Sequence, residues 1–296
     1  MRYVFIINPT AGKGNGTSII PEIEKTLEGK DYKIYVTERS AEGTEIARKE
    51  AESGEEIRMF ACGGEGTGFE VINGIVGFGN VAFGVVPCGS ANDFLKSFGN
   101  KERFFDIAAQ VAGEEKEIDL IKANEYYCIN CCSVGMDAIV ADGMRLFKRI
   151  PLVSGSLAYK LSLLKVFLGK IGIKLKITID GVQTAARDYL FAVCANGPIY
   201  GGGFKAAPNA VPFDGILDYV VINPVSKLKI PSLVKVYEQG RHEGLDICSM
   251  GKCRSMEIES EALMPVNLDG ELVHLKKVEF SIAEKALRFI IPQGNC

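Results

Sequence analysis

The sequence predicts a two-domain α/β protein, in which a parallel sheet covered by helices is followed by a mainly antiparallel β domain. Two observations predict this fold class. Strand and helix patterns alternate up to about residue 120, and short strands dominate from about Glu117 onward. In addition, a chain of 296 residues, 47% of them hydrophobic, is long enough to bury two cores.

The N-terminal part has the pattern of repeated β-α-β units. Buried apolar runs predict strands at residues 4–7, 33–37, 57–61 and 81–87. Helical spacing and end signals predict helices at residues 19–27, 44–53, 70–75, 90–98 and 104–111. Such units form a parallel sheet with helices on both faces, and their ligands bind at the carboxyl ends of the strands.

The C-terminal part is predicted to be mainly antiparallel. Strands are expected at residues 118–122, 126–132, 173–179, 189–195, 217–222, 256–259 and 278–282. Helical insertions are expected at residues 137–147, 156–168 and 226–238. Asp180-Gly181 is a hairpin-turn signal. We therefore expect one domain at residues 1–120 and a second at 121–286, with residues 287–296 returning to the first.

Composition argues against several classes of protein. A net charge of −3 does not favour binding to nucleic acid, and no apolar run approaches the roughly 20 residues that span a bilayer. The N-terminal apolar run is too short for a signal peptide. Nine scattered cysteines are typical of reduced thiols in a cytoplasmic protein. With only His242 and His274, the sequence disfavours a histidine-based hydrolase or a multi-histidine metal site.

Three polar, glycine-containing loops follow three predicted strands. The sharpest is Gly63-Gly64-Glu65-Gly66-Thr67, and the others cover residues 8–14 and 87–94. Consecutive glycines let backbone N–H groups approach a polyphosphate, and a following helix N-terminus favours negative charge. None is a Walker A sequence, so Lys13 could equally be a solvated loop residue. An ordinary strand-to-helix turn, with Ser90 as a helix N-cap, is the alternative interpretation.

Taken in order, these loops and several later motifs form one combination that spans nearly the whole chain. The motifs are Asn8-Pro9-x-x-Gly12, Gly63 to Thr67, Glu70 to Gly74, Gly89 to Phe94, Ile118-Asp119, Asn130, Gly135 to Ala138, Asn196 to Gly203, Pro208-x-Ala210, Asp214 to Asp218 and Leu268 to Glu271. This combination resembles the catalytic-domain family of bacterial diacylglycerol kinases, which also includes sphingosine and ceramide kinases.

The resemblance implies a fold and a set of roles. The expected fold is a phosphofructokinase/NAD-kinase-like α/β domain that binds ATP, followed by a mainly antiparallel β-sandwich domain, with lipid entering the cleft between them. Glu271 would be the general base, and Glu65, Asp93 and Asp119 would surround a catalytic Mg²⁺. The residues implied for the ATP site are Asn8, Thr37, Gly63, Gly64, Glu65, Gly66, Thr67, Glu70 and Ser90.

A second Mg²⁺, with a structural role, is implied by the same resemblance. Asp214 would bind it together with the carbonyl groups of Val211 and Ile216, which are oxygen ligands of the kind that hard cations prefer. A plain hairpin turn at Asp214-Gly215 explains this segment equally well. Taken alone, Asp269-Gly270-Glu271 could likewise be a tight turn.

Two residues depart from the family pattern. Glu65 stands where aspartate is usual and moves the carboxylate outward by one methylene, roughly 1.5 Å. Displacements of about 1 Å can cost a hundredfold in rate. Phe69 stands where asparagine is usual and removes an amide. A slow or silent kinase is therefore a second hypothesis, and a kinase for a soluble acceptor such as NAD is a third.

Residues 143–176 carry eight basic side chains and no Asp or Glu. Apolar residues such as Leu146, Phe147, Leu164 and Phe167 lie between them. We expect this stretch to dock on an anionic membrane, where each cation could add about 1 kcal/mol. Solvated lysines over an ordinary core helix are the alternative. The expected partner is thus a lipid at the inner face of the membrane, and a homodimer is left open.

Overall fold

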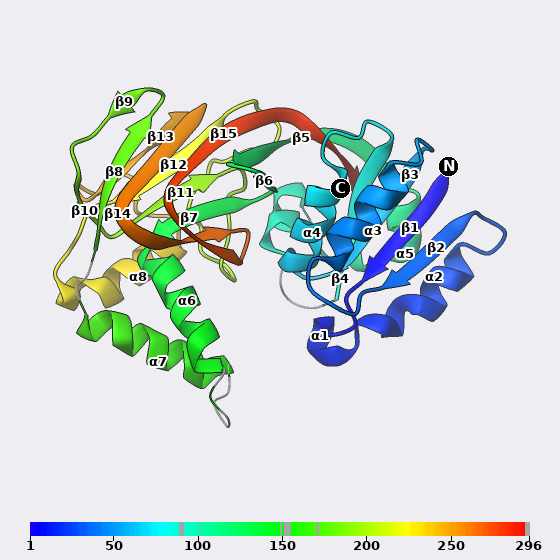
Figure 1. Ribbon diagram of the computed structural model, residues 1–296, viewed down its shortest axis with the longest axis horizontal. Coiled ribbons are helices and arrows are strands. Elements are labelled where there is room, and N and C mark those ends of the chain that lie inside the picture. Colours follow the sequence, from blue (N-terminus) through cyan, green and yellow to red (C-terminus); the bar gives the residue numbers. More distant parts are fainter. Residues whose placement is uncertain (89–91, 100, 149, 151–154, 170–171, 294–296) are drawn as a thin grey trace.

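The computed structural model describes residues 1–88, 92–99, 101–148, 150, 155–169 and 172–293. It confirms the predicted fold class, because an N-terminal α/β lobe and a C-terminal antiparallel β lobe lie side by side (Figure 1). None of the helices in these ranges is long and apolar enough to cross a membrane.

Four parallel strands form the N-terminal sheet, in the order β4-β3-β1-β2. Ile7 pairs with Cys62 and Gly63 with Pro87, so the carboxyl ends of three strands meet at one edge. The elements of this lobe are β1 (Arg2–Ile7), α1 (Ala11–Gly14), η1 (Gly16–Ile19), α2 (Ile20–Thr26), β2 (Tyr32–Val36), α3 (Glu42–Ala51), β3 (Ile57–Gly63), α4 (Glu65–Ile75), β4 (Val81–Pro87), η2 (Asp93–Phe98), η3 (Lys101–Phe105) and α5 (Ile107–Val111).

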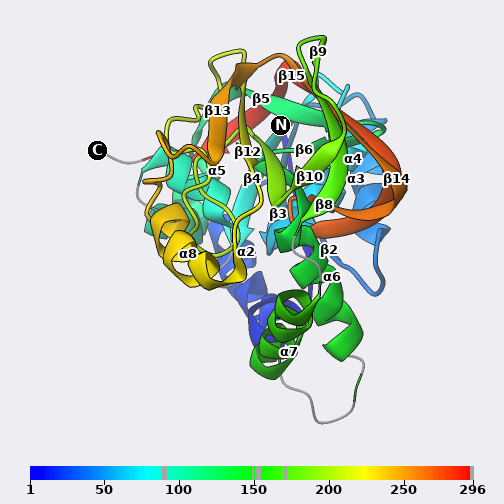
Figure 2. The ribbon, with the colours of Figure 1, turned by 90° about the vertical axis from the view of Figure 1, so that its left-hand side faces the viewer.

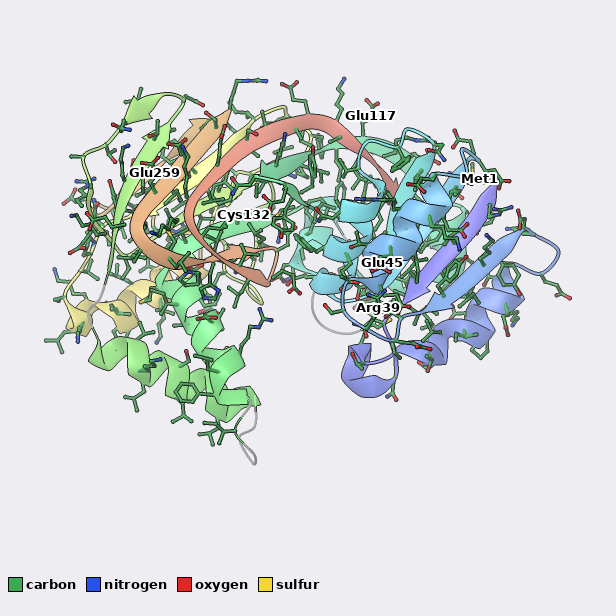
Figure 3. All side chains as sticks on the ribbon, in the orientation of Figure 1. Met1, Arg39, Glu45, Glu117, Cys132 and Glu259 are labelled. Atoms are coloured by element: carbon green, nitrogen blue, oxygen red, sulfur yellow. The ribbon has the colours of Figure 1, made fainter. Side chains whose placement is uncertain are left out.

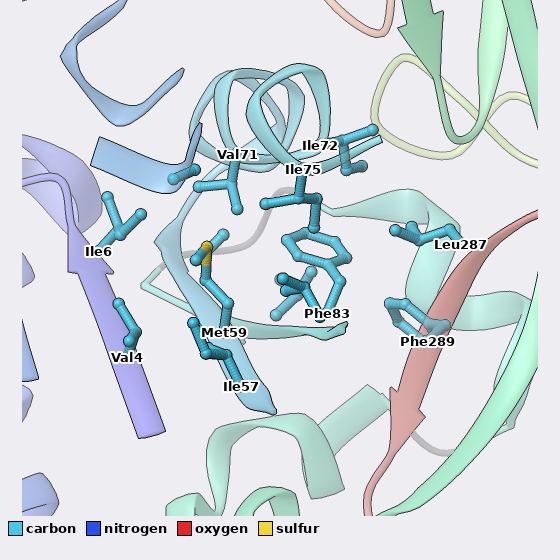
Figure 4. Packing of buried hydrophobic residues seen from close by; sticks show 14 of the residues in the cluster. Val4, Ile6, Ile57, Met59, Val71, Ile72, Ile75, Phe83, Leu287 and Phe289 are labelled. Atoms are coloured by element: carbon cyan, nitrogen blue, oxygen red, sulfur yellow. The ribbon is translucent and has the colours of Figure 1, made fainter. Parts of the chain in front are cut away.

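Helices cover both faces of this sheet because the buried strands alternate their side chains with a period of two. On β1, Val4 and Ile6 pack in one cluster with residues of α3 and α4, whereas Phe5 and Ile7 pack in another with residues of α2 and α5. Figure 4 shows the first cluster, in which the apolar face of α4 lies over the sheet.

The C-terminal lobe is built of antiparallel strands in the order β13-β12-β11-β7-β14-β15, with β8 paired to β14, and β9 and β10 paired to β8. Helices α6 and α7 project together from it (Figures 1 and 2). Its elements are β5 (Glu114–Ala123), β6 (Tyr126–Cys128), β7 (Cys131–Gly135), α6 (Met136–Lys148), α7 (Gly155–Leu168), β8 (Ile173–Ile179), β9 (Val182–Gln183), β10 (Arg187–Tyr189), β11 (Phe191–Ala195), β12 (Leu217–Ile222), η4 (Lys227–Lys229), α8 (Ile230–Glu238), β13 (Cys248–Cys253), β14 (Ser255–Leu268) and β15 (Glu271–Ile291).

One strand, β15, runs through both lobes. It begins as the partner of β14, continues beside β5, and ends parallel to β4, where Arg288 pairs with Ala82 and Phe289 with Phe83. Phe289 is fully buried in the N-terminal core, and its ring lies 4.9 Å from that of Phe98. A register shift between Ala283 and Leu287 marks the crossing.

Some predicted elements differ from the observed ones. Asp180-Gly181 forms the expected two-residue turn between β8 and β9, with positive φ at both residues. The helix predicted at residues 104–111 is divided between η3 and α5, because Asp106 caps α5 through the Ala109 N–H. In the predicted helix at 90–98, the described part from Asn92 onward is a 3₁₀ turn. Residues 89–91 lie outside the described ranges.

Candidate active site between the two lobes

Close backbone packing holds the glycine-rich loops at the carboxyl edge of the N-terminal sheet. Gly63 ends β3, and a Cβ on it would lie 2.3 Å from Thr67 Oγ1. Gly12 has φ +59°, and a Cβ there would lie 2.1 Å from the Cys88 carbonyl oxygen. Neither position has room for a side chain, so the backbones of the loops pack closely against one another. Their N–H groups then lie near the start of α4.

A cleft of about 1020 Å³ opens beside these loops. The loops that follow β1, β2, β3 and β4 line it, together with Glu271 from β15. It includes seven of the nine residues expected at the ATP site, namely Asn8, Thr37, Gly63, Gly64, Gly66, Thr67 and Glu70. Glu65 faces a different cavity, and Ser90 lies outside the described residues.

Two of these cleft residues hold loops in place. Asn8 Oδ1 accepts the backbone N–H and the hydroxyl of Thr10, over 3.0 and 2.8 Å. The Glu70 carboxylate accepts the N–H groups of Ala41 and Gly43, over 2.8 and 3.0 Å, at the start of α3. Their observed contacts therefore shape the cleft wall, and direct contact of Asn8 or Glu70 with a nucleotide stays a prediction.

Arg39 lines the cleft but was not expected there from the sequence. It is exposed and pairs with Glu45, and Figure 3 labels both residues in the N-terminal lobe. A guanidinium beside the cleft suits phosphate oxygens, which it can meet with two parallel hydrogen bonds. Only the fold brings the loop after β2 beside the glycine-rich loops, so no motif identified this residue.

A second cavity of about 360 Å³ lies between the lobes and is lined mostly by apolar side chains. Phe83, Phe94 and Leu95 contribute from the N-terminal lobe, and Phe191 and Leu233 from the C-terminal lobe. Apolar cavities with a few polar groups are typical of small-molecule sites. This one fits an alkyl chain.

The cleft and the apolar cavity share a wall. Glu65 and Gly270 line the apolar cavity, whereas their chain neighbours Gly66 and Glu271 line the cleft. Asn92 lines both. A group held in the cavity at this wall therefore lies next to a group held in the cleft.

Two carboxylates stand at this wall, the half-buried Glu65 and the buried Asp269. Glu65 Oε1 accepts the Asp93 N–H over 3.3 Å, and burial raises the pKa of Glu65. Asp269 accepts the N–H groups of Ile129, Asn130 and Cys131, over 2.5, 3.1 and 2.8 Å. Burial raises the pKa of Asp269 to about 7 in spite of these bonds, and the charge of Glu65 adds to the rise. From the sequence, Asp269 had no expected role of its own.

Glu271 is the residue expected to act as general base. It is exposed on the cleft side of the wall, and its Oε1 lies 2.8 Å from where a Cβ on Gly66 would be. The turn Asp269-Gly270, with positive φ at both residues, aims the side chain across the start of α4. Its position next to the apolar cavity is compatible with the expected role.

Asp93 and Asp119, expected to share a Mg²⁺ network with Glu65, have different surroundings. Asp93 is buried, and its two oxygens contact Lys96 Nζ and the Gly202 N–H, each over 2.7 Å. Its own N–H reaches Glu65, so these two carboxyl groups are neighbours.

Asp119 holds together two segments of backbone. Its oxygens accept the N–H groups of Gly215 and Lys285, each over 2.8 Å. In the ranges that the structure covers, no three His, Cys, Asp or Glu side chains are grouped so as to hold a metal ion. Mg²⁺ on ATP needs only one or two carboxylates, because phosphate oxygens complete its shell. The role of Glu65 in holding that ion stays a prediction. The membership of Asp119 in such a network stays a prediction.

The segment expected to bind a structural Mg²⁺ already contains a cation. Lys252 Nζ lies 2.9 Å from Asp214 Oδ2 and 3.1 Å from Asp218 Oδ2. The Val211 carbonyl accepts the N–H groups of Phe213 and Asp214, over 2.8 and 3.4 Å. Ile216 bonds to Asp214 through its own N–H. An ammonium group therefore lies beside the carboxylate, and binding of Mg²⁺ by Asp214, Val211 and Ile216 stays a prediction.

Phe69, the second departure from the family pattern, lines neither the cleft nor the apolar cavity. Its ring lies 5.9 Å from that of Tyr126, and it packs on the core of the C-terminal lobe. One turn later, the Asn73 amide bonds to the Tyr127 N–H and C=O, each over 2.9 Å. The far half of α4 is thus an interlobe contact.

Two family models match the chain and together span most of it. The model described as the diacylglycerol kinase catalytic domain matches residues 2–123. The model described as the YegS C-terminal NAD kinase beta sandwich-like domain matches residues 130–291. These matches confirm the family that the sequence motifs indicated.

Similar proteins cover nearly the same length. A Shewanella frigidimarina protein named "Probable lipid kinase YegS-like" is 30% identical over 81% of this chain and 77% of its own. A Bacillus subtilis diacylglycerol kinase is 26% identical over 97% and 95%. The crystal structure of a diacylglycerol kinase from Bacillus anthracis has a TM-score of 0.69 at 21% identity, covering 98% of this chain and 96% of that one. The chain belongs to the diacylglycerol kinase catalytic-domain family and carries the YegS-type C-terminal domain.

Proposed function

We propose that this chain is an ATP-dependent lipid kinase that phosphorylates a hydroxyl of a diacylglycerol-like or sphingoid lipid. One observation carries the proposal: a polar cleft and an apolar cavity share the wall formed by Glu65, Gly66, Gly270 and Glu271. ATP would occupy the cleft and the lipid tail the cavity. The names of the similar proteins agree with this assignment.

The cleft supplies what phosphoryl transfer mostly needs, which is positioning and charge neutralisation. N–H groups at the start of α4 and the Arg39 guanidinium would hold the phosphates. A Mg²⁺ ion bound with the nucleotide through Glu65 would neutralise charge on the phosphates. On the other side of the wall, the apolar cavity would exclude water from the lipid.

The lipid hydroxyl must lose its proton as it attacks the phosphate. We assign that proton to Glu271, which is exposed at the shared wall and lies over Gly66. Glu65 is half-buried, and its carboxylate is assigned to the Mg²⁺ of the nucleotide instead. The buried Asp269 holds the N–H groups of residues 129–131 and so fixes the turn that carries Glu271.

The lipid would reach the cavity from a membrane surface along α6 and α7. Met136, Asp137, Val140, Ala141 and Met144 of α6 line the cavity. Farther along the same pair of helices, Leu146, Leu157 and Leu164 are 49%, 43% and 53% exposed. Arg145 and Lys165 are exposed beside them. Exposed leucines among cations suit the interface of an anionic bilayer.

Two other functions remain testable. The burial of Glu65 favours a silent lipid or nucleotide sensor, because the pKa shift works against the charged form. A soluble-acceptor kinase such as an NAD kinase has support in the description of the C-terminal family model. The apolar cavity counts against that third function, since a dinucleotide would leave it unfilled.

ATP turnover with Mg²⁺ against a panel of mixed-micelle lipids and NAD tests these functions. We expect phosphorylation of at least one lipid, its loss in Glu271→Gln, and an equal or faster rate in Glu65→Asp. Glu261→Gln, an exposed glutamate on β14, is the matched control and should leave turnover unchanged. Nucleotide binding without turnover on any lipid would favour the sensor, and full activity in Glu271→Gln would refute the choice of base.

A further inference from the structure

The chain segment that follows β4 passes from the cleft to the apolar cavity. Cys88 lines the cleft, and Phe94 and Leu95 line the cavity. Asn92 lies between them in the sequence, and in the described part of the chain it is the only residue that lines both. If ATP occupies the cleft and the lipid the cavity, the phosphoryl group crosses the wall beside Asn92.

Asn92 has an uncommon backbone conformation. Its φ of 76° and ψ of 63° place it in the left-handed region. Asparagine enters this region more readily than most residues with a Cβ, and glycine enters it more readily still. Residues other than glycine that are held in this conformation cluster at active sites. The turn alone does not explain an asparagine at this position, which indicates a role for its side chain.

The side-chain amide of Asn92 is buried and only partly used. The residue is 6% exposed, and its Nδ2 donates to the Gly63 carbonyl over 3.0 Å. Because Gly63 lines the cleft, this bond holds the amide against the glycine-rich loop. A primary amide carries two N–H donors. Within the ranges that the structure covers, this side chain makes no other hydrogen bond, so one donor is left for a ligand at the wall.

The backbone of Asn92 has a separate contact at the same wall. Burial raises the pKa of Glu65, and the N–H groups of Asp93 and Asn92 oppose that rise. The Asp93 N–H lies 3.3 Å from Glu65 Oε1. A substitution at residue 92 removes the amide but keeps the peptide N–H. The roles of side chain and backbone can therefore be separated.

We infer that Asn92 is a catalytic residue of the proposed kinase reaction, and that its free amide N–H donates a hydrogen bond to the phosphoryl group during transfer. The inference rests on the proposed function. In that step the lipid oxygen bonds to the γ-phosphorus of ATP, the bond from this phosphorus to the bridging oxygen breaks, and ADP leaves. The proton of the lipid hydroxyl goes to Glu271, and Asn92 keeps both of its amide protons.

A donor at this point acts on the charge that the reaction develops. Negative charge is spread over the three equatorial oxygens of the transferring group. The bond to Gly63 fixes the Asn92 amide before the substrates bind, so the donor costs little reorganisation during the reaction. Its contribution belongs to the transition state more than to bound ATP, and its loss should lower kcat more than ATP affinity.

Asn92→Gly removes the side chain without disturbing the backbone. Glycine suits the left-handed conformation and keeps the N–H that acts on Glu65. Loss of one transition-state donor typically lowers kcat by about 10²–10³. On the lipid that wild type phosphorylates best in mixed micelles, we expect kcat to fall by about a hundredfold, while the dissociation constant of ATP changes by less than about threefold.

Asn92→Asp keeps the size of the side chain but removes both N–H donors and adds a negative charge beside the phosphates. We expect its kcat to fall at least as far as that of Asn92→Gly. Asn124 offers a matched control, because it is also left-handed, with φ 51°, and lines neither cavity. Asn124→Gly should leave kcat unchanged. Thermal unfolding of each variant checks that lost activity is not lost structure.

A mimic of the transferring group gives a readout that a purely structural role would not move. Aluminium fluoride bound next to ADP imitates the phosphoryl group in transfer, and transition-state analogues bind much more tightly than substrates. We expect aluminium fluoride with Mg²⁺ to tighten ADP binding to wild type. Asn92→Gly should bind ADP alone as wild type does and lose about tenfold or more of that gain.

Two results would overturn the inference. One is a kcat in Asn92→Gly that equals the wild-type value. The other is a parallel loss of kcat and ATP affinity, since the amide would then only hold the glycine-rich loop at Gly63. If wild type phosphorylates no lipid, the proposed function fails, and the aluminium fluoride comparison decides the inference instead. A gain that depends on Asn92 supports it, whereas no gain, or an equal gain in Asn92→Gly, overturns it.

Discussion

Glu271 lies directly over Gly66, with its Oε1 2.8 Å from the point where a Cβ on residue 66 would stand. The contact joins the start of α4 in the N-terminal lobe to the first residue of β15. Glu271, the proposed base, can hold this position only because residue 66 is a glycine and has no Cβ.

Gly66→Ala should therefore impair turnover more than binding. The new methyl group would push the Glu271 carboxylate away from the shared wall, and a shift of about 1 Å can cost about a hundredfold in rate. We expect kcat to fall by at least tenfold while the dissociation constant of ATP changes by less than threefold. Gly79→Ala, at a glycine where an added Cβ would meet no atom within 4 Å, should change neither quantity.

The raised pKa of Asp269 predicts a pH dependence of stability. Its folded-state pKa of about 7 lies above the usual value of 3.8, so the folded protein holds this proton more tightly than the unfolded chain. The resulting stabilisation is complete below about pH 4 and is lost as the pH rises through 7, by an amount on the order of a few kcal/mol.

Asp269→Asn should remove this slope. Asparagine tolerates the positive φ at residue 269 and keeps one acceptor oxygen, but it does not titrate. Urea denaturation between pH 5 and pH 8 would compare the free energy of unfolding of both proteins. An unchanged slope in Asp269→Asn would assign the pH dependence to another group.

Lys252 predicts how the C-terminal lobe responds to divalent cations. In wild type its ammonium already pairs with Asp214 and Asp218, so millimolar Mg²⁺ should leave the thermal midpoint unchanged. Lys252→Met leaves the two carboxylates unpaired, and Mg²⁺ should then raise the midpoint by binding the folded state. Adding Asp214→Asn to Lys252→Met should abolish that response. A Mg²⁺-dependent rise in wild type would instead support the structural metal site implied by the resemblance.

Phe69 predicts a stability effect separate from catalysis. Its ring packs between α4 and Tyr126, so Phe69→Asn should destabilise the protein by about 1–3 kcal/mol. Turnover of the folded fraction should not rise, because residue 69 faces neither cavity. Phe105→Ala, at a phenylalanine that is 46% exposed, should cost clearly less. Faster turnover in Phe69→Asn would instead indicate that residue 69 contributes to the nucleotide site.

The projecting helices predict salt-dependent binding to anionic vesicles. Reversing Arg145 and Lys165 to glutamate should weaken binding by at least tenfold at low ionic strength, since each surface cation contributes about 1 kcal/mol. Lys25→Glu, on α2 of the other lobe, should have no such effect. Binding that is insensitive to both salt and charge reversal would refute the membrane-docking surface.

Local patterns predicted the helices, strands and loops well, because strand periodicity and glycine-rich turns depend only on short stretches of sequence. Gly63 to Thr67 indicated a phosphate-binding loop for this reason. Long-range contacts were not predictable in the same way. Nothing near Lys252 in the sequence points to Asp214, and Arg39 reaches the cleft only because the loop after β2 lines it together with the loops after β1 and β3.

The cavity between the lobes was the least predictable feature. Its walls come from residues as far apart as Glu65 and Asp269, and Phe83 and Leu233. Their apolar side chains look in the sequence like ordinary core residues. Asp137 stood in a recognisable motif, but its hydrogen bond with the Tyr200 hydroxyl, sixty-three positions later in the chain, follows only from the fold.

The passage of β15 through both lobes has a mechanical consequence. Its pairing passes from β14 through β5 to β4, and at the register shift between Ala283 and Leu287 Asp119 accepts the Lys285 N–H at the point where the strand could bend. Opening the lobes like a hinge would require breaking these bonds. We therefore expect the site to be formed largely before phosphate donor and acceptor bind, and we expect gating to come from loops and from α6 and α7 rather than from motion of whole domains.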